Sequence, residues 1–478
     1  MDYIIKGYEP ECMFRFFEDI SAIPRGSNNE AGIADFLVSF AQERNLKYFR
    51  DDLNNVLIKM PATAGYESEP AVLLQGHTDM VCEKNAATEH DFLTDPLRLY
   101  IKDGYLHADG TTLGADNGVA VALMMALLDG AAAEHPALEC LFTSSEETGL
   151  IGAIGFDYSH VTARSMINLD VEGEGQVTVG CAGGCRTDIR IPVEFVKAAG
   201  DAMTLSISGL MGGHSGADIT LGRANANKLM GRILLALRRE YDYNLISFNG
   251  GLMGNAIPRE CEAVITCANA QELKSKALKI ADDIAAELCA ADEGFKFSCQ
   301  RIDTPQLMMN CASTRRVVTA IGTVQDGVLR MSTDIEGLAE FSCNLGVVTT
   351  DEHEVELVFN SRSAIESQLE AAIDYLDALA DMCDSTAEHY SRYPGWKYAK
   401  QSPLRDKYMV AAREVLGVEP EVLAIHAGLE CGVVKSHVPD MDIIAIGPNA
   451  QNIHTPDERL ELSSFSRMFK IVERMLKK

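Results

Sequence analysis

The chain begins with short apolar runs that alternate with helical patterns. Three of the runs end in charged residues: 71–79 (AVLLQGHTD), 137–147 (ALECLFTSSEE) and 165–175 (SMINLDVEGEG). Each is typical of a buried strand that stops where the polar residues begin. Between the first two, residues 117–133 are apolar nearly all round, which predicts a buried helix. Strands that alternate with helices predict an α/β layer with a largely mixed or parallel sheet.

The pattern changes near residue 183. Two segments alternate apolar and polar positions, as strands with one face in water do: residues 185–195 and 202–210. Helical patterns follow at about 222–240 and 271–290. A second round has strand patterns and then a helical one, at 338–350, 354–362 and 364–382. Two such rounds predict an α+β domain. They also suggest an internal duplication, although no residue-level repeat accompanies them.

The α/β pattern resumes after residue 397, with a strand-like run at 441–448 and an amphipathic helix over 463–478. We therefore predict one α/β domain formed by residues 1–182 and 398–478. An α+β domain of residues 183–397 is inserted into it.

Charge and composition exclude several classes of partner. The 478 residues carry 42 Lys and Arg against 70 Asp and Glu, a net charge of −28. We expect no nucleic-acid or membrane partner, because phosphate-binding surfaces need an excess of basic residues. We also expect no signal peptide and no membrane span, since neither apolar pattern occurs. The 13 scattered cysteines lack a CxxC pair and fit buried thiols in a cytoplasmic protein.

Candidate chemistry stands where the apolar runs end. Glu146 and Glu147 are adjacent. Two negative charges at so short a distance repel each other, which favours a cation or a proton between them. His77 and Asp79 are two apart at a predicted strand end, so both side chains project the same way. In α/β sheets the strand ends are where ligands bind.

Three more residues complete this set. Asp116 lies in a glycine-flanked turn before the buried helix, Asp170 follows the third apolar run, and His454 follows the last strand. Imidazole and carboxylate together suit zinc or another borderline divalent metal. Two histidines and three carboxylates suffice for two ions if one carboxylate bridges. Singly, such residues more often cap turns or face solvent, and only their shared placement favours a metal site.

Five motifs in this order resemble a known family: GHTDMV, LGADNGVA, SSEETGLIGA, LDVEG and HTPDERL. They look like the aminoacylase/carboxypeptidase-type family of di-zinc peptidases. More narrowly, GHTDMVCEKN, DGTTLGADNG and AIHAGLECG resemble the bacterial aminoacyl-histidine (Xaa-His), carnosinase-like dipeptidases. The resemblance covers essentially the whole chain. It implies a zinc-exopeptidase-like catalytic domain with a central mixed sheet, into which an α+β lid is inserted.

The resemblance also implies how the metals are held. Asp116 would bridge two zinc ions, for which cobalt or manganese could substitute. His77 and Asp170 would complete one site, and Glu147 and His454 the other. Each ion would keep an open position for water or substrate.

Two further residues would act beside the metals. By resemblance, Asp79 orients the ring of His77. Glu146 takes the proton of the water shared by the metals and hands it to the leaving amine. The family also implies a cis peptide between Asp116 and Asn117.

The inserted domain would supply the remaining groups. By resemblance, His214 polarises the scissile carbonyl, and Arg362 binds the free carboxylate of the substrate. Asn255 is a further candidate for substrate binding. Lid histidines of relatives with a shorter lid act across a dimer. Because this lid is long, we predict that His214 serves its own chain, whether the protein is a monomer or a homodimer.

Six other residues are left without a catalytic role. His426 and Glu430 are candidates for the lining of the substrate pocket. We expect the others to be surface or structural: His90, His107, His135 and His437.

The resemblance implies a metal-dependent dipeptidase of short peptides such as β-alanyl-histidine. Two alternatives stay open. One is a related tripeptidase or N-acyl amino acid deacylase, because the sequence does not fix the amine end of the substrate. The other is a non-catalytic metal-binding protein of the same fold. Glu146 disfavours the latter, since only the chemistry requires it.

Overall fold

The computed structural model describes residues 3–288 and 290–478, which form two compact units. Unit 1 comprises Met1–Cys181, Trp396–Ala424 and Leu429–Lys478, and unit 2 comprises Ala182–Gly395 and Ile425–Gly428. The sequence had placed residues 425–428 in the catalytic segment. They group with unit 2, where the Ala182 N–H donates to the carbonyls of Ile425 and Ala427 at 3.2 and 3.0 Å.

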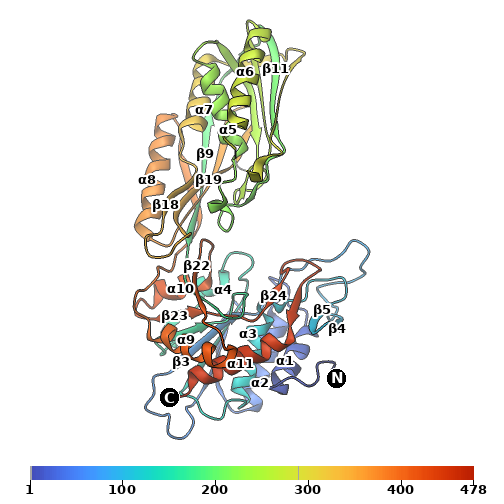
Figure 1. The fold of residues 1–478 in the computed structure, drawn as a ribbon, viewed down its shortest axis with the longest axis vertical. Coiled ribbons are helices and arrows are strands. Elements are labelled where there is room, and N and C mark those ends of the chain that lie inside the picture. The colour runs from blue at the N-terminus through green and yellow to red at the C-terminus, as the bar shows by residue number, and fades with distance from the viewer. Residues whose placement is uncertain (1–2, 289) are drawn as a thin grey trace. The chain divides into compact units, whose positions relative to one another are not determined.

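Unit 1 is built on an eight-stranded sheet (Figure 1). Its order is β1 (Lys47–Arg50), β2 (Val56–Met60), β6 (Leu138–Thr143), β3 (Val72–His77), β7 (Ser165–Asn168), β23 (Asp442–Ala445), β8 (Gln176–Cys181) and β22 (Glu421–Ile425). The central strands β6, β3, β7 and β23 are parallel, whereas β1 and β2 pair antiparallel with their neighbours and β8 pairs antiparallel with β23. The mixed sheet expected from the sequence is therefore confirmed.

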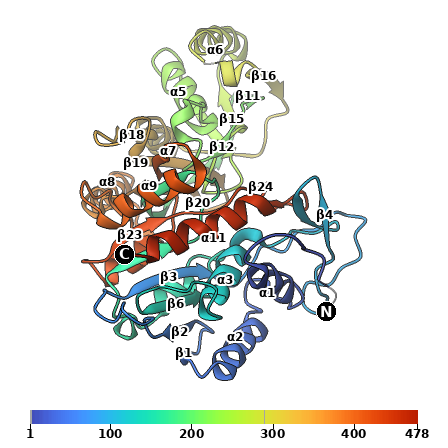
Figure 2. The ribbon, with the colours of Figure 1, turned by 60° about the horizontal axis from the view of Figure 1, so that its bottom comes forward.

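Helices cover this sheet. They are α1 (Glu11–Ser21), α2 (Ala31–Glu43), α3 (Ala115–Leu128), α4 (Ile151–Gly155), α9 (Pro403–Leu416), α10 (Glu430–His437) and α11 (Leu462–Leu476). Nearly every residue of α3 is buried, because this helix packs both on β3 and against α1 (Figure 2). A smaller sheet joins β24 (Ala450–Gln451), β25 (Arg459–Glu461), β5 (Tyr105–Ala108) and β4 (Leu99–Lys102).

Unit 2 contains a nine-stranded antiparallel sheet. Its strands are β16 (Lys296–Ile302), β11 (Asp201–Ser208), β15 (Cys261–Cys267), β13 (Tyr243–Gly250), β19 (Ala339–Thr350), β20 (Glu354–Ser363), β9 (Gly183–Pro192) and β21 (Ala387–Tyr393), with β18 (Gly327–Met331) beside β19. The helices are α5 (Ala226–Leu237), α6 (Ala270–Ala285), α7 (Cys311–Thr323) and α8 (Glu366–Met382). They share one hydrophobic core with the sheet.

The two rounds of strands in unit 2 are joined into one sheet. Strand β13 of the first round meets β19 of the second through the pair Gly250 and Val348. This continuity agrees with the expected α+β architecture, while an internal duplication stays a prediction. Among the described residues, no helix is both long and apolar enough to cross a membrane.

Candidate metal centre

Three parallel strands of unit 1 bring their carboxyl ends to one edge of the sheet. His77, the last residue of β3, lies opposite Thr143 of β6, and Gln75 of β3 lies opposite Asn168 of β7. The loops that leave these strands carry Glu146, Glu147 and Asp170. Residues far apart in sequence therefore gather at this edge.

The first cluster consists of His77, Asp116 and Asp170. The Nε2 atom of His77 lies 3.0 Å from Oδ1 of Asp116 and 3.3 Å from Oδ1 of Asp170. One ligand atom from each residue lies within 4.8 Å of the others, so the three could hold one ion.

The second cluster uses the other oxygen of Asp116. The Nε2 atom of His454 lies 3.1 Å from Oδ2 of Asp116 and 3.0 Å from Oε1 of Glu147. His454 has a φ of +62°, a left-handed conformation that is uncommon outside glycine and concentrates at functional sites. Asp116 thus belongs to two clusters, each with its own histidine.

Asp79 is buried and contacts one member of each cluster, His77 and Glu147, as well as Glu146. Its Oδ1 lies 3.3 Å from Nδ1 of His77. The same carboxylate accepts the backbone N–H groups of Glu146 at 3.0 Å and Glu147 at 3.3 Å. The hydroxyl of Ser27 donates to it at 2.8 Å. Asp79 therefore fixes the turn of the two glutamates as well as the ring of His77.

The electrostatics indicate a shortage of positive charge. Burial lowers the pKa of His77, but Asp170, Asp116 and Asp79 outweigh it and raise this pKa well above its usual value. Hydrogen bonds to Asp116 and Glu147 raise the pKa of His454 to about 10. Each imidazole would thus hold a proton between carboxylates. A divalent cation could replace these protons, so the donor set fits a metal pair.

Glu146 lies beside both clusters. A carboxylate oxygen of Glu146 comes within 4.8 Å of ligand atoms of His77 and Glu147. Burial raises the pKa of Glu146 well above its usual value, and the charges of Asp170, Glu430 and Glu147 add to the effect although His77 opposes it. A buried carboxyl with a raised pKa is suited to accept and return a proton near neutrality.

The peptide bond between Asp116 and Asn117 is cis, as the resemblance implied. The amide of Asn117 donates to the carbonyl of Leu169 at 2.7 Å, next to Asp170. This bond ties the start of α3 to the loop after β7.

In unit 2 the structure brings His214 and Arg362 together. An Nη2 atom of Arg362 lies 3.4 Å from Nε2 of His214, and Nη1 donates to the hydroxyl of Tyr393 at 2.8 Å. Arg362 is only 5% exposed, and its Nε has no hydrogen-bond partner among the described residues. Strand β12 (Gly213–His214) pairs with β14 (Ala256–Ile257), with His214 opposite Ala256. The exposed Asn255 is the residue before Ala256 and therefore lies near His214.

His426 and Glu430, to which the sequence assigns no catalytic role, are both buried and hydrogen-bonded. His426 in unit 2 lies 2.7 Å from the hydroxyl of Ser342, and burial together with the charge of Arg362 lowers its pKa to about 4. In unit 1 the fully buried Glu430 accepts hydrogen bonds from Gln75 and Thr143, and burial raises its pKa to about 7. The motif AIHAGLECG was the only sequence signal for either residue.

The histidines expected to be structural make local contacts. The rings of His107 and His437 stack on Tyr100 and Tyr158. His135 is fully buried, with Nδ1 2.7 Å from the carbonyl of the next residue.

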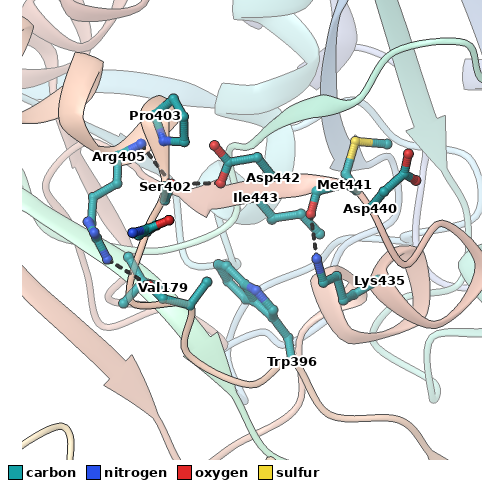
Figure 3. Close-up of a pocket in the computed structure, with 12 residues that line it drawn as sticks. Val179, Trp396, Ser402, Pro403, Arg405, Lys435, Asp440, Met441, Asp442 and Ile443 are labelled. Carbon is teal, nitrogen blue, oxygen red and sulfur yellow. Dashed lines mark hydrogen bonds between the residues drawn. The ribbon is translucent and has the colours of Figure 1, made fainter.

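A separate pocket of about 180 Å³ opens in unit 1 beside Trp396 (Figure 3). Its polar groups serve the local backbone. Ser402 donates to Asp442 at 2.6 Å, where it caps α9, and Lys435 donates to the carbonyl of Met441 at 2.7 Å. Such a lining offers much less chemistry than the clusters at the strand ends.

The chain is similar to several known peptidases. The sequence profile of peptidase family M20/M25/M40 matches residues 73–478. The cytosol non-specific dipeptidase of Escherichia coli (strain K12) is 36% identical over 472 residues, which cover 98% of this chain and 97% of that protein. The crystal structure of aminoacylhistidine dipeptidase from Vibrio alginolyticus has 35% identity and a TM-score of 0.93, covering 98% of this chain and 96% of that one. Aminopeptidase PepT from Bacillus cereus shares the fold at 16% identity, with a TM-score of 0.57 and 98% of each chain covered.

Proposed function

Because the chain belongs to peptidase family M20/M25/M40 and is a metallopeptidase, we propose that it is a dipeptidase whose two metal ions share Asp116. One observation carries this proposal. The two oxygens of Asp116 face different histidines, His77 at 3.0 Å and His454 at 3.1 Å. A carboxylate that serves two ions needs this arrangement.

We assign the remaining ligands by cluster. Asp170 joins His77 in the first site, and Glu147 joins His454 in the second. Mixed nitrogen and oxygen donors favour zinc, with cobalt or manganese as possible replacements. When bound, such ions lower the pKa of water toward neutrality and polarise a carbonyl oxygen.

The chain's own residues then move the proton. Glu146 is the proposed general base, which accepts the proton of the attacking water and returns it to the leaving amine. The carboxylate of Asp79 accepts the backbone N–H of Glu146 at 3.0 Å. This hydrogen bond keeps the carboxyl group of Glu146 beside the clusters.

Residues of unit 2 serve substrate binding in this proposal. Arg362 is buried with an unpartnered Nε, and a buried guanidinium favours a carboxylate, which it can bind through two parallel hydrogen bonds. We assign it to the C-terminal carboxylate of the peptide. Burial and the charge of Arg362 lower the pKa of His214, so its ring is neutral at pH 7. His214 would act as a hydrogen-bond donor to the scissile carbonyl, and Asn255 would be a further contact.

The names of two relatives support the substrate class. One is a non-specific dipeptidase and the other an aminoacylhistidine dipeptidase. We propose that Xaa-His dipeptides such as β-alanyl-histidine are among the substrates. The name of the Escherichia coli relative also supports a cytosolic place of action.

A substrate panel tests the proposal. Metal-free protein would be reconstituted with zinc, cobalt or manganese and given Xaa-His dipeptides, tripeptides, N-acetyl amino acids and dipeptides with an amidated C-terminus. We expect the unblocked dipeptides to be hydrolysed fastest. Faster hydrolysis of tripeptides or N-acetyl amino acids would replace the dipeptidase assignment, and the absence of all turnover would favour a metal-binding protein.

A further inference from the structure

The carboxylate of Glu458 accepts hydrogen bonds from the backbone N–H groups of residues 113–116, the segment that ends at Asp116. Glu458 is 2% exposed. Its Oε2 accepts the N–H groups of Leu113 at 2.7 Å and Gly114 at 2.9 Å, and its Oε1 accepts those of Ala115 at 2.8 Å and Asp116 at 3.3 Å. One side chain therefore binds four successive amides, the last of which belongs to the proposed bridging residue.

These amides precede the regular part of α3, because Asp116 and Asn117 have non-helical backbone angles, with ψ of 104° and 38°. Hydrogen bonds to a carboxylate are stronger than those to a neutral acceptor. Both oxygens of Glu458 must accept for all four bonds to form. An amide side chain of equal size cannot do this, because one of its two ends only donates.

Arg25 holds the same turn from another direction. The guanidinium is fully buried and donates to the carbonyl of Gly114, and it also donates to the carbonyls of Thr78 at 3.0 Å and Asp79 at 3.3 Å. Gly114 has a φ of +66°, and a Cβ there would lie 2.6 Å from Nη2 of Arg25. The turn before Asp116 is thus fixed through its amides by Glu458 and through a carbonyl by Arg25.

Glu458 is also tied to His454. Both residues belong to the loop of residues 452–458, in which the Glu458 N–H donates to the carbonyl of Thr455 at 3.1 Å and the Thr455 hydroxyl donates to the carbonyl of Asn452 at 2.8 Å. His454 in turn lies 3.1 Å from Oδ2 of Asp116. Glu458 therefore links two segments that are more than 300 residues apart, and each carries one proposed ligand.

We propose that Glu458 is a positioning residue that holds Asp116 and His454 at the separation the metal pair requires. It touches neither metal nor substrate in this account and acts through the backbone of Asp116. The inference rests on the proposed function, since it assumes that both residues bind metal.

The test compares Glu458→Gln with a matched control, Glu139→Gln. Glu139 is likewise buried, at 3% exposed, and accepts the N–H groups of Thr162 and Ala163 at 2.9 and 3.1 Å. It lies near the start of β6, whereas the clusters gather beyond the end of that strand. Both variants lose a buried carboxylate that binds backbone amides, but only one of them lies next to the proposed ligands.

Zinc affinity would be measured by competition with a chromophoric chelator, together with the visible spectrum after cobalt substitution and the Tm of the metal-free proteins. We expect Glu458→Gln to weaken zinc binding at least about tenfold, as loss of a ligand-orienting partner does, and to change the cobalt spectrum. Glu139→Gln should lower the Tm and leave affinity and spectrum unchanged. Zinc affinity within twofold of wild type in folded Glu458→Gln would overturn the proposal, as would an equal loss of affinity in Glu139→Gln.

A second measurement needs no variant, in case Glu458→Gln does not fold. Hydrogen exchange of the metal-free wild type would be followed in peptides covering residues 111–118 and 452–460. If Glu458 links the two segments, they open together and show the same protection factor, which is the intrinsic rate of the free peptide divided by the observed rate. A protection factor more than tenfold lower in 111–118 than in 452–460 would overturn the link. If the wild type itself fails to bind two ions, the proposed function falls, whereas two ions bound by folded Glu458→Gln with wild-type affinity remove only the role of Glu458.

Discussion

Glu146 and Glu147 are adjacent in sequence but have different surroundings. Glu147 contacts His454 at 3.0 Å, whereas Glu146 comes close to His77 and carries a pKa that burial raises. Asp79 holds the turn that contains both glutamates, because its carboxylate accepts hydrogen bonds from both of their backbone N–H groups. This difference is the basis for assigning one residue to the metal and the other to the proton.

Replacement of Glu146 by alanine should separate catalysis from metal binding. General bases contribute about 100- to 10,000-fold to the rate, so we expect turnover to fall by at least 100-fold while two ions remain bound. Turnover of a dipeptide and metal content by atomic emission would be measured on the same preparation. Full metal content with near-normal turnover would remove Glu146 from the mechanism.

The charge state of His426 gives a prediction for pH dependence. Burial and Arg362 lower its pKa to about 4, below the value of about 6.5 of a free imidazole. The folded protein should therefore keep His426 neutral at pH 5, where an unfolded chain binds a proton. This residue contributes stability above pH 6.5 that is lost as the pH falls through 4.

Histidine-selective NMR of the metal-free protein would test the state of His426. The resonance that disappears in His426→Gln identifies the residue, and we expect it to show no protonation between pH 8 and pH 5. A midpoint near 6.5 for that resonance would contradict the assignment.

At the scale of elements, the contact between β3 and α3 places His77 beside Asp116. Gly76 of β3 faces α3, and a Cβ there would lie 2.3 Å from Cβ of Ala120 and 2.3 Å from Oδ1 of Asn117. A side chain at this position must therefore push the strand and the helix apart. The strand carries one proposed ligand, and the start of the helix carries another.

Replacement of Gly76 by alanine should consequently lower both the Tm and the zinc affinity. The control is Gly32→Ala in α2, where a Cβ meets its nearest neighbour at an ordinary 3.5 Å. Alanine in a helix is more favourable than glycine by up to about 1 kcal/mol, so this control should keep or raise the Tm and leave zinc binding unchanged. Unchanged zinc affinity in Gly76→Ala would show that the spacing between β3 and α3 does not matter for the metal centre.

The strands that bear candidate ligands could be predicted because their residues are apolar on both sides. The run at 71–79 corresponds to β3 (Val72–His77), and the helix expected at 117–133 corresponds to α3, which begins two residues earlier. The contacts of Glu458 and Arg25 could not be predicted in this way. They depend on three distant segments meeting at one turn, and no local pattern in the sequence records that meeting.

At the scale of the whole molecule, the proposed reaction draws on both units. The proposed metal ligands and Glu146 belong to unit 1, and His214 and Arg362 belong to unit 2. In the sequence the second unit is long enough for two rounds of strands and helices, which led to the prediction that His214 serves its own chain. Whether the protein is a monomer or a homodimer, this prediction has a direct test.

Two inactive variants, His214→Ala and Glu146→Ala, would be mixed under conditions that exchange subunits. If His214 acts within its chain, every active site keeps one defect, and we expect the mixture to stay inactive. If it acts across a dimer, some sites carry neither change and activity returns. Recovered activity would contradict the in-chain prediction.

The central claim is that one carboxylate, Asp116, serves two metal ions. The most direct measurement is the zinc content of Asp116→Ala and of the wild type after equilibrium dialysis at equal free zinc, with circular dichroism to verify that both are folded. We predict two tightly bound ions in the wild type and the loss of both together in the variant, because the two carboxylate oxygens of Asp116 face separate histidines. Retention of one ion at full occupancy in Asp116→Ala would contradict the bridge.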